Sequence, residues 1–311
     1  MILSVSRRTD IPCCYPEWFF KRIEAGKVLV RNPYNKNQIS EISLAPDVTD
    51  CIVFWTKNPE PMLHDLGRLD QYMYYFQFTL NGYGKDMEPG LPDKEHLISV
   101  FQKLSDQIGP KRVIWRYDPI LFSRTYTMEY HQKVFADIAG RLKGYTQQVV
   151  ISLVDIYKRT RDNAAVLGLE KKEKSETEAF LSSLARTAGK NGMRIVTCAE
   201  ALDLKKYGIE HGSCIDRTLI EDLTGCGIDA PEEKGQRPEC GCARSLDIGT
   251  YNTCKNGCRY CYANYSDPLM RFHISRYSAD SPLLCDSLEE ADHITVRKTG
   301  SWKNPQLKLK L

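Results

Sequence analysis

Residues 51–71 read CIVFWTKNPEPMLHDLGRLDQ, in which an apolar, β-branched run at 51–55 is followed by helical spacing of apolar positions at 59–71. A continuous apolar run of this length is typical of a strand that is buried on both faces, as in a parallel sheet. The stretch therefore predicts one strand-helix unit of an α/β fold.

The same pattern recurs on both sides of this stretch. Further apolar runs lie at 2–5, 28–30, 74–78, 113–115, 149–153, 194–197 and 245–251, and further helical patterns at 16–25, 93–108, 128–142 and 171–190. Eight strands predict a TIM-type (β/α)8 barrel. The turn signals Asn-Pro and Asn-Lys-Asn within 28–44 allow a hairpin there, which would leave a partial barrel. An open doubly wound sheet is the architectural alternative.

Polar residues follow directly after the predicted strands, at 6–10, 31–33, 56–59, 79–82, 116–119, 155–157 and 198–200. In a barrel these strand ends share one rim, where barrel enzymes place their chemistry. The guanidinium groups of Arg7, Arg8 and Arg116 suit a phosphate or a carboxylate. We predict catalytic roles for these three arginines and for Asp118, the alternative being ion pairs with Asp10 or Asp118.

The composition excludes several classes of protein. The 311 residues, 42% of them hydrophobic, are enough for one large domain or two ordinary ones. Lys and Arg total 43 against 40 for Asp and Glu, so the formal charge of +3 predicts no general polyanion-binding surface. No apolar run approaches the roughly 20 residues that cross a bilayer, and the N-terminus lacks the apolar region of a signal peptide. We therefore expect a cytoplasmic protein with no membrane partner.

Twelve cysteines stand out in this composition, and most of them lie between Cys198 and Cys261. In a long chain under reducing conditions, this density favours metal or cluster ligation over disulfides. Cys254, Cys258 and Cys261 have the spacing C-x3-C-x2-C, which lets one loop direct three soft thiolates at one centre. The spacing predicts an iron–sulfur or zinc site, and three ligands leave one iron of a cluster open to a small molecule.

This loop resembles that of the radical S-adenosylmethionine (radical SAM) superfamily, whose C-x3-C-x-aromatic-C loop follows the first barrel strand; Tyr260 occupies the aromatic position. The resemblance implies a [4Fe–4S] cluster held by Cys254, Cys258 and Cys261. It also implies that the open iron chelates S-adenosylmethionine, with Tyr260 beside the adenine. Electron transfer from the reduced cluster would then release a 5′-deoxyadenosyl radical, which abstracts a hydrogen from the substrate.

Two features differ from that superfamily. Its Gly-Gly-Glu segment, which contacts the cosubstrate, has no clear equivalent, and Asn81 and Glu200 are the candidates in its place. The cysteine loop also follows about seven predicted strands instead of preceding them. A circularly permuted barrel, in which 246–251 lies beside the strand that begins at Ile2, accounts for this order.

The chain as a whole resembles an uncharacterised bacterial family, a domain of unknown function with radical-SAM-like C-terminal cysteines, over most of residues 1–265. We divide it into four parts by pattern and composition. These are an α/β barrel body at 1–228, a loop with cysteines at 229–244, the last strand with the cluster-binding loop and helix at 245–266, and a C-terminal extension at 267–311.

Four more thiols lie in the same region, at Cys198, Cys214, Cys240 and Cys242. Four thiolates are the usual complement of a closed [4Fe–4S] or zinc site, although this spacing is no standard motif and free cysteines also pack as small hydrophobes. Both interpretations stay open, with Cys226 as the substitute ligand. The cysteines that lack such an arrangement are interpreted as structural: Cys13, Cys14, Cys51 and Cys285.

The sequence thus predicts a radical SAM-type enzyme whose small-molecule or nucleotide-like substrate binds in the barrel and whose reductant is a carrier such as flavodoxin or ferredoxin. The alternative is a non-catalytic iron–sulfur protein that transfers electrons or senses redox state. The polar rim favours the enzyme, because an electron carrier needs no large polar cavity. A zinc-dependent nucleic-acid-binding protein is disfavoured by the near-neutral charge.

Overall fold

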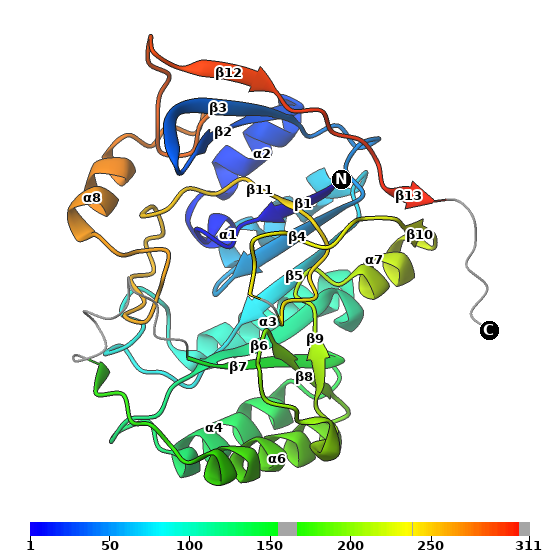
Figure 1. Cartoon of the computed structure of the whole chain (residues 1–311), viewed down its shortest axis with the longest axis vertical. Coiled ribbons are helices and arrows are strands. Elements are labelled where there is room, and N and C mark those ends of the chain that lie inside the picture. The colour runs from blue at the N-terminus through cyan, green and yellow to red at the C-terminus, as the bar shows by residue number, and fades with distance from the viewer. Residues whose placement is uncertain (155–166, 238, 305–311) are drawn as a thin grey trace.

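The computed structural model describes residues 1–154, 167–237 and 239–304. Its centre is a sheet of eight parallel strands in the order β11-β1-β4-β5-β6-β7-β8-β9 (Figure 1). The strands are β1 (Ile2–Val5), β4 (Cys51–Thr56), β5 (Tyr74–Thr79), β6 (Val113–Ile120), β7 (Gln148–Leu153), β8 (Arg194–Cys198), β9 (Glu210–Gly212) and β11 (Leu246–Asp247). The predicted α/β fold around a large parallel sheet is therefore confirmed.

One predicted barrel strand is wrong. The run at 28–30 belongs to β2 (Lys27–Asn32), which pairs antiparallel with β3 (Asn35–Ser43), and β12 (His293–Val296) lies parallel beside β3. The Asn-Pro turn signal reverses the chain here, so the hairpin alternative is the correct one. The eighth strand of the main sheet is instead β9, whose sequence Glu-His-Gly has no apolar run and was not predicted.

The strand before the cysteine motif lies at one edge of the sheet. β11 pairs in parallel with β1, with Leu3 opposite Leu246 and Ser4 opposite Asp247. This is the adjacency that the permuted order predicts. Among the described residues, no strand pairing joins β11 to β9 at the opposite edge, so the sheet is not a closed (β/α)8 barrel.

The predicted helices are present, with one difference in type. They are α2 (Pro16–Glu24), η1 (Glu60–Leu69), α3 (Lys94–Ile108), α4 (Met128–Arg141) and α6 (Lys174–Lys190). η1 is a 3₁₀ helix that begins directly after Pro59. Shorter elements complete the chain: α1 (Ile11–Cys14), η2 (Pro110–Arg112), η3 (Lys205–Tyr207), α7 (Arg217–Thr224), α8 (Asp267–Ser275), and the pair β10 (Gly227–Ile228) and β13 (Lys303–Asn304).

Side chains of the central strands alternate between two buried layers. In β6, Trp115 packs into the core shared with α3, α4 and α6, whereas Ile114 packs into a second core shared with α7 and β10. The helices α3, α4 and α6 therefore cover one face of the sheet, and α7 and β10 lie against the other (Figure 1). Burial on both faces is why the strands read as continuous apolar runs.

His131 of α4 is fully buried in the helix-side core. Its Nδ1 lies 2.7 Å from the Tyr117 hydroxyl and its Nε2 lies 2.9 Å from the carbonyl oxygen of Leu121. Burial lowers the pKa of His131 to about 4, so the ring is neutral near pH 7.

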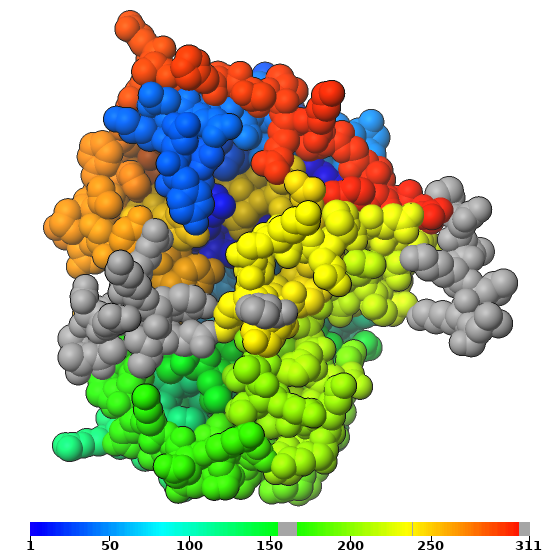
Figure 2. Space-filling model, viewed as in Figure 1, coloured from blue at the N-terminus to red at the C-terminus, as the bar shows by residue number. Residues whose placement is uncertain are grey.

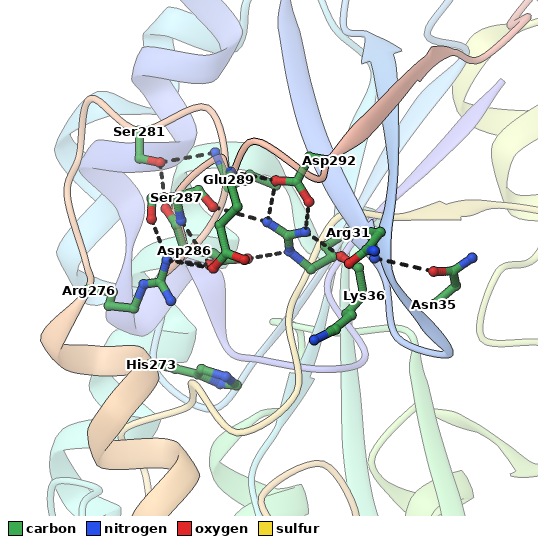
Figure 3. A network of polar contacts seen from close by, with 12 residues as sticks. Arg31, Asn35, Lys36, His273, Arg276, Ser281, Asp286, Ser287, Glu289 and Asp292 are labelled. Carbon is green, nitrogen blue, oxygen red and sulfur yellow. Dashed lines mark hydrogen bonds and ion pairs between the residues drawn. The ribbon is translucent and has the colours of Figure 1, made fainter.

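The C-terminal extension is held against the β2–β3 hairpin by a charged network (Figure 3). The Nε of Arg31 donates to Asp286 at 2.6 Å, and its Nη2 donates to Asp292 at 2.9 Å. Arg276 forms a further ion pair with Asp286 at 3.2 Å. Every helix in the described residues is too short or too polar to span a bilayer. The polar segment predicted at 155–157 lies outside the described residues.

Candidate functional site

The cysteine loop begins directly after β11, and its two ends are tied together. The backbone N–H of Asn252 donates to the carbonyl oxygen of Ala263 at 2.9 Å. The Asn252 side-chain oxygen in turn accepts hydrogen bonds from the backbone N–H groups of Tyr265 and Ser266, at 2.9 and 3.1 Å. These hydrogen bonds therefore close the loop that carries the three thiols.

A buried carboxylate fixes this loop to the ends of β1 and β4. Asp10 accepts hydrogen bonds from the Asn256 side chain at 2.9 Å, from the backbone N–H of Lys57 at 2.7 Å and from that of Cys13 at 3.1 Å. Burial raises the pKa of Asp10 to about 6, even though these hydrogen bonds oppose that rise. Tyr15 adds a hydroxyl hydrogen bond of 2.5 Å to the Thr253 carbonyl.

The segment 87–90 packs against the other side of the loop. The backbone N–H of Gly90 donates to the carbonyl oxygen of Asn256 at 3.1 Å, and that of Arg259 donates to Met87 at 3.0 Å. A Cβ atom on Gly90 would lie 2.7 to 2.9 Å from the backbone of Asn256. Only glycine permits this close approach.

Beneath the loop lies a buried charge network that includes Tyr260. The Lys57 ammonium lies 2.9 Å from both the Glu88 carboxylate and the Tyr260 hydroxyl. Glu88, whose side chain is 1% exposed, also pairs with Lys94 and accepts from the Tyr260 hydroxyl. Asn81 donates to the same hydroxyl at 3.2 Å. Burial disfavours the charge on Glu88, but the two ammonium groups outweigh it and keep its pKa below the usual range. Two lysines thus face one carboxylate.

The three thiols of the motif are half-buried and interact electrostatically with one another. Cys258 interacts electrostatically with Cys261, Cys254 and Lys57; burial is the main cause that raises its pKa, and Lys57 acts against that rise. Cys254 is also hydrogen-bonded to the thiol of Cys14. Cys14, interpreted as structural from the sequence, therefore lies beside this group.

The donor set suits a cluster more than a single ion. Among the described residues, no three His, Cys, Asp or Glu side chains already surround one point as ligands of one metal ion would. Cys254, Cys258 and Cys261 nevertheless come from one constrained loop, and Lys57 supplies positive charge beside them. Three soft thiolates from one loop are ligands of the kind that an iron–sulfur cluster takes, each on a different iron.

Arg7 and Arg8 follow β1, as predicted, but the partner expected for them is wrong. Both guanidinium groups lie 4.0 Å from the carboxylate of Asp247 in β11, because Asp10 is occupied by Asn256 and backbone N–H groups. Asp247 also accepts from the backbone N–H of Arg7 at 2.8 Å. The two arginines thus join β1 to β11 just before the cysteine loop.

Arg116 and Asp118 form the ion pair that the sequence offered as the alternative to a catalytic role. Burial opposes ionisation of Asp118, but Arg116 outweighs it, and a hydrogen bond from Ser152 helps to keep the pKa of Asp118 low. The Arg116 and Arg7 guanidinium groups lie 5.2 and 5.9 Å from the Trp55 ring, within cation–π range. These residues form a polar layer at the carboxyl ends of the strands.

The two residues proposed in place of a Gly-Gly-Glu segment have different positions. Asn81 reaches the cysteine loop through Tyr260, and it also donates to the Asp118 carbonyl at 3.0 Å. Glu200 follows β8, and no hydrogen bond or ion pair between described residues joins it to the loop. Asn81 therefore lies at the site, whereas Glu200 comes shortly after Cys198 in the chain.

The second group of thiols is also brought together. The sulfur atoms of Cys198 and Cys214 are 3.0 Å apart. Cys214 is hydrogen-bonded to Cys242 and Cys242 to Cys240. Within the described residues, the substitute Cys226 contacts Thr224 and none of these four thiols.

Sequence reasoning missed the residues that support the loop. Lys57 lay within a predicted polar strand end, but nothing in the sequence linked it to Glu88, which lies in the connection between β5 and α3, or to Lys94, which begins α3. Two surface hollows lie elsewhere, one lined by residues such as Lys27 and Arg297 and the other by residues such as Leu66 and Arg112.

Comparison with known proteins identifies a family whose function is described as unknown. The sequence model of one family, described as Domain of unknown function (DUF1848), matches residues 2–263, a range that includes both groups of thiols. No curated protein matches the chain. The expected resemblance to an uncharacterised family is therefore confirmed.

Proposed function

We propose that this chain, which belongs to the DUF1848 family, is an iron–sulfur enzyme of the radical SAM type. The observation that carries the proposal is the position of the cysteine loop. It directly follows a strand that pairs with β1 at the carboxyl ends of a parallel sheet, where α/β enzymes bind their ligands. Cys254, Cys258 and Cys261 would hold a [4Fe–4S] cluster there.

The charges beneath the loop support the proposal. Three thiolates bring negative charge into a buried region, where charge is costly unless it is compensated. Lys57 and Lys94 exceed Glu88 by one positive charge, and Lys57 interacts directly with Cys258. This excess offsets part of the charge of a three-thiolate cluster and would also attract the carboxylate of an amino-acid cosubstrate.

When bound, the cluster and S-adenosylmethionine would supply a 5′-deoxyadenosyl radical. The residues of this chain would bind and orient these ligands and shield them from water. Asn81 and Lys57 hold the Tyr260 hydroxyl, which fixes the ring between the second and third cysteines. Arg116, Asp118 and Trp55 form the polar layer on the same side of the sheet, and we assign substrate contact to them.

The alternative is a non-catalytic iron–sulfur protein that carries electrons or senses redox state. The polar layer favours an enzyme, because electron transfer requires no buried arginine–carboxylate pair at the ends of the strands. S-adenosylmethionine distinguishes the two functions, since a carrier has no use for it.

The test is anaerobic. Reduced, cluster-loaded protein should change its electron paramagnetic resonance spectrum when S-adenosylmethionine is added, and slow turnover without substrate should release 5′-deoxyadenosine. The Cys254→Ala/Cys258→Ala/Cys261→Ala variant should do neither. A fully loaded cluster that gives neither a spectral change nor 5′-deoxyadenosine would favour the electron carrier.

A further inference from the structure

The second group of thiols is assembled from three distant parts of the chain. Cys198 ends β8, Cys214 follows β9, and Cys240 and Cys242 come from the loop before β11. Hydrogen bonds connect them in the order Cys198, Cys214, Cys242, Cys240. Random apolar packing does not usually bring four cysteines from separate segments into one contact chain.

Cys214 is the best-fixed member of this group. Its carbonyl oxygen accepts hydrogen bonds from the Tyr75 hydroxyl and the Gln77 amide, each at 2.8 Å. Nη1 of Arg116 donates to its sulfur atom at 2.8 Å. Arg116 therefore contacts both this sulfur atom and its carboxylate partner Asp118, and a hydrogen bond from a guanidinium group stabilises a thiolate ligand more than a neutral thiol.

The loop with Cys240 and Cys242 is strapped against the segment after β9. The Ser213 hydroxyl donates to the Gly241 carbonyl at 2.7 Å, and the backbone N–H of Ala243 donates to Ile215 at 3.0 Å. Cys214 and Cys242 are each 3% exposed, while the other two thiols are half-buried. The thiols are therefore shielded on one side and accessible to an entering ion on the other.

We infer that Cys198, Cys214, Cys240 and Cys242 bind one thiophilic metal ion of the zinc class. Zinc–sulfur bonds of about 2.3 Å in a tetrahedron place ligand sulfurs about 3.8 Å apart. The sulfurs of Cys198 and Cys214, at 3.0 Å, are closer than that, and moving this pair apart by under about 1 Å on deprotonation would match the tetrahedral spacing. A four-iron cluster would require a much larger expansion, since each cysteine binds a different iron.

The ion would link the two edges of the sheet. Cys198 and Cys214 belong to the β8–β9 edge, whereas Cys240 and Cys242 lead into β11 at the other edge, where no strand pairing connects the described residues. Figure 2 shows the segment that contains these last two thiols, coloured yellow, packed across this face. A structural ion here would hold the chain that leads to the cysteine loop, and its binding energy would add to the stability of the fold.

The site is independent of the proposed enzyme activity, so the test removes the cluster ligands first. The full chain with Cys254→Ala, Cys258→Ala and Cys261→Ala should still contain one zinc ion per chain by elemental analysis. After removal of the metal by a chelator with a reductant present, Co²⁺ should restore one equivalent of binding, with the visible bands of tetrahedral thiolate coordination.

Substitutions of one buried and one half-buried member of the site complete the test. On the same background, Cys214→Ser and the half-buried Cys240→Ser should each lower Co²⁺ affinity at least tenfold and weaken the thiolate charge-transfer band. The matched control Cys226→Ser should leave both unchanged. Circular dichroism verifies folding, and Cys240→Ser keeps the inference testable if Cys214→Ser fails to fold. A folded chain that binds no Zn²⁺ or Co²⁺, or whose binding survives both substitutions, would overturn the inference.

Discussion

Glu88→Gln is the substitution that most directly challenges the charge network beneath the cysteine loop. Glu88 is 1% exposed, and it is the carboxylate that both Lys57 and Lys94 contact. The amide would keep the shape of the side chain while leaving two buried ammonium groups without a counter-charge. Removal of one partner from a buried ion pair costs about 3–5 kcal/mol, and we expect the free energy of unfolding to fall by about 3 kcal/mol because Lys94 is 26% exposed.

Urea unfolding of the metal-free chain, followed by tryptophan fluorescence, measures this change. Glu41→Gln is the matched control, since the Lys27–Glu41 pair has the same 2.9 Å separation but its lysine is 58% exposed. That surface pair should contribute at most about 1 kcal/mol.

A second variant separates charge from shape. If uncompensated charge is the cause, Glu88→Gln combined with Lys94→Met should regain at least about 1 kcal/mol relative to Glu88→Gln alone, which is the signature of coupled residues. A Glu88→Gln chain as stable as the Glu41→Gln chain would refute the reasoning. Additive effects of the two changes would show that the lysines do not depend on Glu88.

Three further predictions follow from other contacts. The pKa of His131 is about 4 in the folded chain and about 6.5 in the unfolded chain, so the unfolded chain binds more protons below neutrality. The free energy of unfolding should therefore fall by about 2 kcal/mol between about pH 7.5 and about pH 5 because of His131 alone. His131→Gln should remove this part of the pH dependence in urea titrations. If the free energy of unfolding depended on pH equally in the unmodified chain and in His131→Gln, the role assigned to His131 would be wrong. Gly90→Ala, whose Cβ meets the Asn256 backbone, should cost about 1–3 kcal/mol and lower the iron retained after reconstitution, whereas Gly67→Ala, which meets nothing within 4 Å, should do neither. Arg31→Ala should make residues 267–304 sensitive to limited proteolysis with little change in the urea midpoint, and an unchanged digestion pattern would show that the network of Figure 3 does not hold the extension.

The parallel sheet was predictable because its strands are buried on both faces. In β4 the unbroken apolar run that begins at Cys51 predicts a buried strand, and similar apolar runs predict β5 to β8. β9 was missed because none of its three residues is apolar and two of its side chains are exposed. The hairpin at β2 and β3 was ambiguous, since an apolar strand in a small sheet and one in the main sheet have similar sequences.

The site was only partly predictable. A local spacing of three cysteines identifies a loop, and the adjacency of β11 to β1 followed from the permuted order. The Glu88 network and the Asp10–Asn256 contact depend on the packing of connections, which leaves no periodic signal. For the same reason the ion pairs offered as the alternative to catalytic roles for Arg7 and Arg8 named the wrong carboxylates, whereas Asp247 becomes a partner of both only once β11 pairs with β1.

Iron and acid-labile sulfide counts on the anaerobically reconstituted protein test the central claim most directly. The chain should contain about four irons and about four sulfides, and Cys254→Ala/Cys258→Ala/Cys261→Ala should lose them while keeping its circular dichroism spectrum. Cys51→Ala/Cys285→Ala, which removes two buried thiols outside both groups, should retain them. An iron and sulfide content that is unchanged in the triple variant, or that is absent from the unmodified chain, would contradict the assignment of a cluster to this loop.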